Sequence, residues 1–388
     1  MIVNSNVGIR INMTFSDTVD QNDSFRVTFP SGLGVTFSSV STSGSSEGVS
    51  SLNGQVLSVS QNVNFNVIYY KDYFMVINFY TMTAPPSTKI SDPITVELLR
   101  NGYQKMIGTA TVQATASTLQ CSVSPQNTLI STQTLYVFSI TLNDKLSSGG
   151  WLEIFFPSDI VLNGNVSIAS GTGTNINSNP VISIDSILGK VTVISLNSST
   201  SFINTQTFTL TIGTITNPGS TKPTGTFSIK SYYQSGSDYL VAIGTCNGIT
   251  AVSGILKSSD ISISKSSDVV LASNIDYTIS FVTGYAIPKN GIIKIEIPND
   301  VGIDLTNLQS NCYQTVNTSS LLTATCTVIL NTTTNKYQLT VSSIALTSNL
   351  TGNSTISILL QGICTNPDTT RNVIGFTINT YTSDGFLI

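Results

Sequence analysis

The stretch NGIIKIEIPNDV, residues 290–301, is an alternating apolar run that follows a turn-prone pair and leads to a proline. Two other stretches have the same form: GGWLEIFFPSDI, residues 149–160, and NDSFRVTFPSGL, residues 22–33. Alternation is typical of a half-buried β-strand, and a proline limits further strand pairing. The dipeptides Gly149-Gly150 and Asn290-Gly291 favour hairpin turns, because they tolerate positive φ. One strand motif therefore occurs three times.

The sequence around this motif repeats as well. A strand-like segment begins 21 residues before each proline, at Ile9, Tyr136 and Tyr277. A second proline follows in TAPPSTK, TNPGSTK and TNPDTTR, and the spacing of the two prolines grows from 55 to 61 to 69 residues. Loops accommodate such insertions, so the repeated unit is a folding module.

A last match, KMIGTATV with VAIGTCNG, joins the first two copies, and the third copy stops before it. We place modules at about 1–115, 116–250 and 251–388, the third cut before its last strand. The segments that join the modules contain alternating apolar residues, so we expect one module's last strand to run directly into the next module's first strand. An apolar strand-like end also suggests a piece of a longer protein.

Strand patterns such as LYVFSITL and TFTLTIG cover the chain, and no long helical periodicity is present. Many short strands with frequent turns are typical of β-sandwiches. The chain resembles tandem immunoglobulin-like repeats of large extracellular proteins, which implies an all-β fold of three tandem Ig-like β-sandwich modules in a rod-like array. We expect it to lack the Cys–Trp–Cys pattern of antibody domains, with no cysteine pair bracketing Trp151, the only tryptophan. The Asn/Thr/Ser/Ile-rich composition also resembles long surface proteins of ciliates and other protists.

Composition excludes several classes of function. Charged residues make up 9% of the 388 residues, against about 25% in ordinary domains. The 16 Lys and Arg residues form no cluster, which argues against binding to nucleic acid or anionic lipid. The chain has no histidine, which removes Ser-His-Asp systems and His-ligated metals. A hydrolase with two carboxylates stays open, but no acidic pair stands out. We expect no enzyme and no cofactor.

Three aspartates, Asp17, Asp20 and Asp23, could supply oxygen ligands to Ca²⁺. The other two copies lack these acids, so a polar inter-strand loop is favoured. Clustered aromatic residues, as in VIYYKDYF, could form a sugar-binding platform, although aromatic residues in strands belong more often to the core.

The chain has five cysteines, and the odd number suggests an intermolecular bond or a partner in further sequence. Cys312 and Cys326 lie on two strands joined by a turn, and we predict a disulfide between them. Free buried thiols are the alternative. We expect Cys121 and Cys246 to lie too far apart to pair, because they are near opposite ends of the second module. Each would then pair across a junction or with another chain, and Cys364 stays open as a partner.

The sequence contains eight Asn-x-Ser/Thr motifs. A chain rich in these residues produces such motifs by chance, but on a secreted protein some would carry N-linked glycans and keep a weakly charged surface soluble. The motifs are at Asn12, Asn22, Asn165, Asn197, Asn317, Asn331, Asn349 and Asn353.

These observations predict a non-enzymatic structural region of a secreted or cell-surface protein that builds an extracellular filament, coat or stalk. The expected partners are copies of the same chain or neighbouring subunits, because sheet edges with few charges can be protected when a neighbouring chain adds a strand. An adhesin with a binding tip, or the accessory region of a carbohydrate-active enzyme, are the alternatives.

Overall fold

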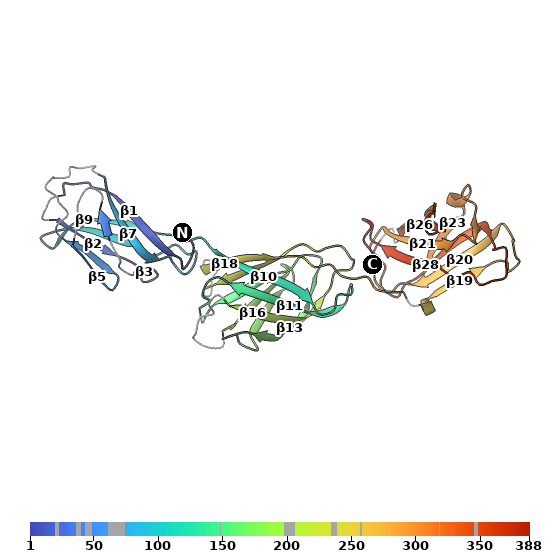
Figure 1. Cartoon of the computed structure of the whole chain (residues 1–388), viewed down its shortest axis with the longest axis horizontal. Helices are drawn as coiled ribbons and strands as arrows, with labels where there is room; N and C mark the ends of the chain where they lie inside the picture. The colour runs from blue at the N-terminus through green and yellow to red at the C-terminus, as the bar shows by residue number, and fades with distance from the viewer. Residues whose placement is uncertain are drawn as a thin grey trace.

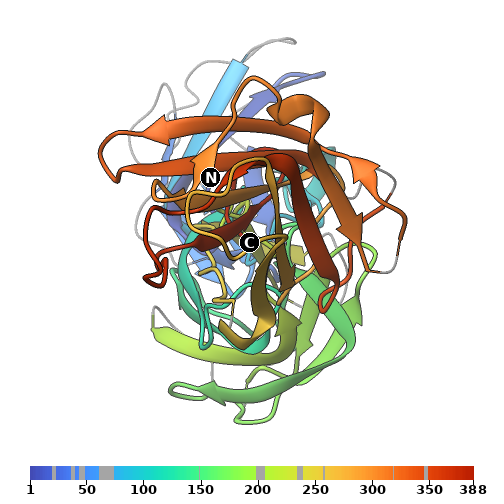
Figure 2. The same cartoon turned by 90° about the vertical axis from the view of Figure 1, so that its right-hand side faces the viewer.

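The structure is a computed structural model that describes residues 1–19, 23–35, 40–42, 49–60, 74–147, 149–197, 206–233, 239–256, 258–317, 319–344 and 348–388. Three β-sheet bodies follow one another in an elongated array (Figure 1), and a large cluster of buried apolar residues lies in each. Viewed along the long axis, the bodies lie one behind another (Figure 2). We call them the N-terminal, middle and C-terminal bodies. The all-β expectation is confirmed, whereas the boundaries near residues 115 and 250 stay predictions.

The N-terminal body has two antiparallel sheets. One has the order β1-β7-β3, with β4 also paired to β7, and the other has the order β5-β6-β2-β8-β9. Its strands are β1 (Asn6–Thr14), β2 (Asp23–Thr28), β3 (Gly34–Val35), β4 (Val40–Thr42), β5 (Val49–Asn53), β6 (Val56–Ser60), β7 (Phe74–Thr83), β8 (Ile94–Arg100) and β9 (Tyr103–Ala110).

In the middle body, one strand connects the two sheets. β10 pairs in parallel with β18 through Ser117 and Thr118, and then pairs antiparallel with β11 as far as Pro125. The full order is β13-β16-β11-β10-β18-β17-β12-β15-β14. The strands are β10 (Ser117–Pro125), β11 (Gln133–Leu142), β12 (Trp151–Phe155), β13 (Val161–Thr172), β14 (Val181–Asp185), β15 (Lys190–Ile194), β16 (Thr207–Thr216), β17 (Phe227–Tyr232) and β18 (Leu240–Cys246).

The C-terminal body repeats this plan in two separate sheets. Their orders are β19-β20-β27-β23-β24, with β22 also paired to β27, and β25-β26-β21-β28. Two 3-10 turns, η2 (Ser258–Asp260) and η3 (Leu308–Ser310), accompany the strands. The strands are β19 (Ile261–Lys265), β20 (Ile275–Val282), β21 (Gly291–Pro298), β22 (Gly302–Ile303), β23 (Cys312–Val316), β24 (Leu322–Thr323), β25 (Thr325–Asn331), β26 (Lys336–Ile344), β27 (Thr355–Thr365) and β28 (Thr377–Tyr381).

The three bodies share most of their strands, although β24 has no counterpart in the other two, and each end body lacks one strand pairing that the middle body has. β9 and β18 are edge partners of β8 and β17, but in the C-terminal body only a single bridge, Tyr381 to Leu387, begins such a strand beside β28. Likewise β10 pairs with β11 and β19 with β20, but among the described residues β1 pairs only with β7. The two end bodies thus each have one open sheet edge that is covered in the middle body.

The repeated proline motif forms the same turn in each body. The strands β2, β12 and β21 lead to Pro30, Pro157 and Pro298, and the carbonyl of each proline accepts a hydrogen bond at 3.0 Å from the amide three residues later. The residues that donate these bonds, Leu33, Ile160 and Val301, are buried. The motif therefore ends a central strand and returns an apolar side chain to the core.

The hairpin predicted before this motif is wrong. β20 and β21 lie in different sheets, as do β1 and β2, so the connection crosses the sandwich. Asn290, not Gly291, has the positive φ of 60°. A Cβ on Gly291 would lie 2.3 Å from a methyl carbon of Ile287, and one on Gly150 would lie 2.6 Å from a methyl carbon of Leu146. These glycines serve close packing at the start of a strand.

The junction segments also differ from the prediction. Residues 111–116 and 247–256 carry no strand beyond single bridges, Ile2 to Thr115 and Leu129 to Val252. The last strand of one body is therefore not continuous with the first strand of the next, although bridges tie both segments to the preceding body.

The middle and C-terminal bodies each contain a buried Tyr–Asn pair, and the two pairs are at corresponding positions. The Tyr136 hydroxyl donates to Asn217 Oδ1 at 2.6 Å, and the Tyr277 hydroxyl donates to Asn366 Oδ1 at 2.8 Å. Burial raises the pKa of Tyr136 far above its usual value, so the phenol stays a neutral donor. In the N-terminal body Ile9 and Ala84 take these positions, so both partners have become apolar together.

We expect Tyr136→Phe to lower the free energy of unfolding of the middle body by about 1–3 kcal/mol, because Asn217 Oδ1 is left buried without its donor. Urea titration of the whole chain, followed by the fluorescence of Trp151, reports on this body because Trp151 is the only tryptophan. The matched control is Tyr103→Phe, at a residue that is 80% exposed, and it leaves the curve unchanged. An unchanged curve for Tyr136→Phe would contradict the assignment.

Candidate functional site: the open end of the C-terminal body

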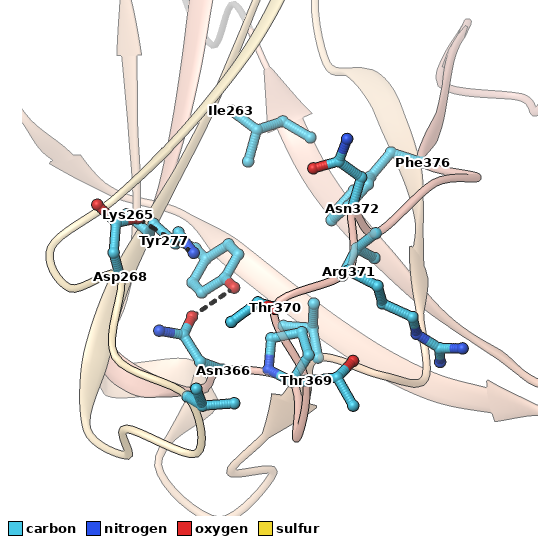
Figure 3. A pocket seen from close by; sticks show the side chains of 14 residues that line it. Ile263, Lys265, Asp268, Tyr277, Asn366, Thr369, Thr370, Arg371, Asn372 and Phe376 are labelled. Carbon is cyan, nitrogen blue, oxygen red and sulfur yellow. Dashed lines mark hydrogen bonds and ion pairs between the residues drawn. The ribbon is translucent and has the colours of Figure 1, made fainter.

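A pocket of about 480 Å³ opens in the C-terminal body (Figure 3). Its lining comes from β19, from the loop between β19 and β20, and from residues 366–376 between β27 and β28. Figure 3 shows Ile263 and Phe376 on one side of the pocket, with Tyr277 and Asn366 at its base.

Asn366 organises the loops of this site. Its side-chain nitrogen donates to the carbonyls of Ser267 and Val269, both at 2.8 Å, while its oxygen accepts from Tyr277. The amide of Leu271 then donates to the carbonyl of Pro367 at 3.1 Å. Because Asn366 is 3% exposed, these bonds form away from water and fix the two loops against each other.

The charges at the pocket are paired near the surface. Lys265 lies 3.2 Å from Asp268, which is 94% exposed, and Arg371 lies 2.5 Å from Asp300. Asp268 is the only carboxylate in the lining, so the pocket lacks the two carboxylates of a glycosidase. The lining also offers no nucleophile with an adjacent base.

The pocket occupies a position that the chain itself covers in the other two bodies. The backbone carbonyl of Val112 accepts a hydrogen bond from the amide of Ser91, and the amide of Val112 donates to the Ser91 hydroxyl. Ile249 makes the same two backbone bonds with Thr224. Val373, which corresponds to Ser91 and Thr224 because it lies six residues after Pro367, lines the pocket. The pocket is thus the place of a segment that follows the last strand in the other bodies.

The structure contradicts the expectation that Cys121 and Cys246 cannot pair. They form a disulfide with a Cα–Cα distance of 5.1 Å. The expectation treated the two ends of a module as distant, but the parallel pairing of β10 with β18 places the first and last strands side by side. This disulfide also brackets Trp151 in the sequence, so a cysteine pair does flank the only tryptophan.

A second disulfide joins Cys312 and Cys326, with a Cα–Cα distance of 6.3 Å. It links β23 in one sheet to β25 in the other. Cys364 is a free, buried thiol, and burial together with nearby Asp276 raises its pKa to about 12. Such a thiol is poorly nucleophilic at neutral pH.

Two of the three candidate calcium ligands have cationic partners. Both Asp23 oxygens accept from Arg100, at 2.7 and 2.9 Å, and Asp17 lies 3.6 Å from Lys105. Asp20 lies outside the described residues. No group of three metal-binding side chains occurs in the described part of the chain.

The predicted glycosylation sites have different surroundings. Asn12, Asn317, Asn349 and Asn353 are exposed and Asn331 is half-buried, whereas Asn22 and the side chain of Asn165 lie outside the described part. Asn197 is half-buried, and its amide nitrogen, the atom that would carry a glycan, donates to the carbonyls of Leu146 and Ser147.

No family model and no curated protein matches the chain. The chain is similar to the C-terminal domain of the Streptococcus pyogenes antigen I/II-family protein AspA, with 8% identity over 70% of this chain and 97% of that chain and a TM-score of 0.25. The corresponding domain of Streptococcus agalactiae BspA gives 9% identity over 68% and 95%, with a TM-score of 0.24. The major pilin SpaD of Corynebacterium diphtheriae gives 6% over 88% and 76%, with a TM-score of 0.25.

Likenesses this distant carry no argument about the fold or the role of the chain. These three proteins come from bacteria, so they give no support to the resemblance with protist surface proteins. Within the described residues, no helix has the length and apolar character needed to cross a membrane.

Peptide mapping without reduction is expected to recover Cys121 with Cys246 and Cys312 with Cys326. Cys364 is expected to resist iodoacetamide at pH 8 in the folded chain and to react once urea unfolds it, because burial both shields the thiol and suppresses its thiolate form. Rapid alkylation of Cys364 in the folded chain would contradict the buried position.

For protein made in a glycosylating host, we expect a glycan at Asn353 and none at Asn197, since a glycan on Asn197 would break two hydrogen bonds. Glycopeptide mass spectrometry measures both sites. Thr355→Ala is the control, because it removes the Asn353 motif without changing Asn353 and should abolish that glycan. A fully occupied Asn197 would show that the inward position of its amide is wrong.

Proposed function

We propose that the chain is a non-enzymatic structural region of a secreted or cell-surface protein, which acts as an extended spacer or filament-forming segment. The observation that carries this proposal is the repetition of one interface at both junctions. The amide of Thr88 donates to the carbonyl of Leu240 in the next body at 2.8 Å, and the amide of Thr221 donates to the carbonyl of Leu387 at 2.9 Å.

The two loops that contain Thr88 and Thr221 also each place a lysine over an aromatic ring of the following body. Lys89 Nζ lies 4.6 Å from the ring centroid of Tyr239, and Lys222 Nζ lies 5.5 Å from that of Phe386. Lys222 also pairs with Asp384 at 2.8 Å. Each exposed contact contributes little by itself, but together with the backbone bond they define one orientation.

A small apolar core supports each junction. Val3, Ala114 and Val241 form a buried cluster at the first junction. At the second, Ile130 of the middle body is 0% exposed and belongs to the core of the C-terminal body, together with Ala251 and Ile388. Buried contacts of this kind favour an array that keeps its extended form, as a stalk or spacer requires.

Two further features support an extracellular location. Disulfides persist in oxidising compartments, and this chain contains two. The exposed Asn-x-Ser/Thr motifs provide sites for glycans that would solubilise a surface with few charges.

An adhesive role is the second candidate, favoured by a feature of the C-terminal body. Cys312 and Cys326 close a loop that carries Leu321 and Leu322, which are 48% and 50% exposed. A disulfide-closed loop with exposed apolar residues offers a contact surface for a partner protein.

Antibodies raised against the folded chain are expected to label intact cells of its source before permeabilisation, in extended structures at the surface. A cytosolic protein, labelled only after permeabilisation, is the control. Labelling of the chain only after permeabilisation would overturn the surface role, whereas labelling of single patches at cell–cell contacts would favour the adhesive candidate.

A further inference from the structure

The loop sequence that is present at both junctions occurs a third time, in the C-terminal body. Thr370 and Arg371 in TNPDTTR correspond to Thr221 and Lys222 in TNPGSTK. Residues 368–372 are all exposed, whereas Thr88 and Thr221 are half-buried at their junctions. One copy of the junction loop therefore has no following body within the chain.

The apolar residue of the junction is correspondingly uncovered at this end. The amides of Asn4, Ser131 and Leu271 bond to the carbonyls of Pro85, Pro218 and Pro367, so the residues that precede them are equivalent. Those residues are Val3, 1% exposed, Ile130, 0% exposed, and Val270, 37% exposed. Val270 also lines the pocket beside Thr370 and Arg371.

The other half of the interface is uncovered at the opposite end of the array. The match of KMIGTATV with VAIGTCNG aligns Tyr103 with Tyr239, the ring that Lys89 covers. Phe386 has the same role at the second junction, two residues before the end of the chain. Tyr103 is 80% exposed, whereas Tyr239 and Phe386 are half-buried.

The ends of the array are formed by these loops and not by the chain termini. Figure 1 shows the N-terminus at the first junction and the C-terminus at the second. Neither terminus lies at an outer end of the array, and by the sequence repeat Tyr103 and Arg371 correspond to the two sides of a junction. A second chain can thus approach either end as the neighbouring body does inside the chain.

We propose that copies of this chain associate head to tail, with Thr370 and Arg371 of one copy bound to the Tyr103 turn of the next. The amide of Thr370 donates to the backbone carbonyl of Gln104, and the Arg371 guanidinium stacks on the Tyr103 ring. The contact is heterologous, since two different surfaces meet, and such contacts continue as open filaments. This inference rests on the proposed structural role and gives it a specific interface.

One difference makes this contact weaker than the internal junctions. The residue that corresponds to Val241 and Ile388 is Lys105, whose ammonium group donates to the carbonyl of Thr18 and lies near Asp17 and Asp23. Val270 therefore has no apolar partner at this position of the next copy, and no linker raises the local concentration. The association is expected to be reversible and to grow with protein concentration.

Sedimentation velocity of the whole chain over a range of concentrations is expected to show species that increase in steps of 41.2 kDa. Arg371→Glu and Tyr103→Ala should each weaken this association about ten-fold, equivalent to 1.4 kcal/mol. The controls are Lys289→Glu, which makes the same charge change elsewhere on the C-terminal body, and Ile187→Ala, which removes a 94% exposed side chain from the middle body. Both controls should associate like the unchanged chain.

An equimolar mixture of the two interface variants provides the decisive measurement. An Arg371→Glu chain keeps its Tyr103 surface, and a Tyr103→Ala chain keeps its Arg371 surface, so the mixture should form dimers and nothing larger. Circular dichroism checks that each variant is folded. Failure to form dimers in the mixture, or a monomeric unchanged chain at every concentration, would overturn the interface. Antibody labelling of intact cells tests the surface role independently, so the two failures can be told apart.

Discussion

The buried amide of Asn217 connects the interior of a body to its contact with the next one. One end of the amide accepts from Tyr136, and the other donates to the carbonyls of Asn127 and Leu129 at 2.7 Å. These bonds fix the backbone immediately before Pro218, from which the junction loop extends to Lys222. The buried side-chain amide of Asn217 has all its hydrogen-bond partners and therefore holds the base of the loop in place. The loop can then position the backbone amide of Thr221 and the ammonium group of Lys222 on the following body.

In the N-terminal body the junction loop forms without a Tyr–Asn pair, because both residues of the pair are replaced by apolar ones. Ile9 and Ala84 replace the pair, and the junction loop still places Lys89 over Tyr239. A tyrosine without the asparagine, or the reverse, would leave a buried polar group unpaired, which costs more than the bond contributes. The coupled replacement is a physical reason why the repeats remain alike in shape while they differ in sequence.

Sheet edges set the second constraint on this array. In the middle body β10 pairs with both β11 and β18, so neither of these strands lies at a sheet edge, and the Cys121–Cys246 disulfide fastens β10 to β18. Each end body lacks one of these pairings among the described residues, so that β1 and β28 are edge strands there. Open edges in a chain with few charges favour pairing with other polypeptides.

The repeats made the strands and the proline turns predictable, because alternation and spacing are local properties of the sequence. They do not reveal which strands share a sheet: the turn-prone pair Asn290-Gly291 predicts a hairpin, although β20 and β21 lie in different sheets. The candidate site was missed for the same reason. Val270, Thr370 and Arg371 carry no chemical motif, and the signal that could have found them was the third copy of the junction loop without a following body.

The β-class, the repeated motif and the short separation of Cys312 and Cys326 can be read from the amino-acid sequence, since these depend on periodicity and on neighbouring residues. The contact of Cys121 with Cys246 across 125 residues cannot, because it depends on the parallel pairing of the first and last strands of the body, which the separation in sequence does not reveal. The positions of the two termini, the N-terminus at the first junction and the C-terminus at the second, are likewise visible only in the folded chain.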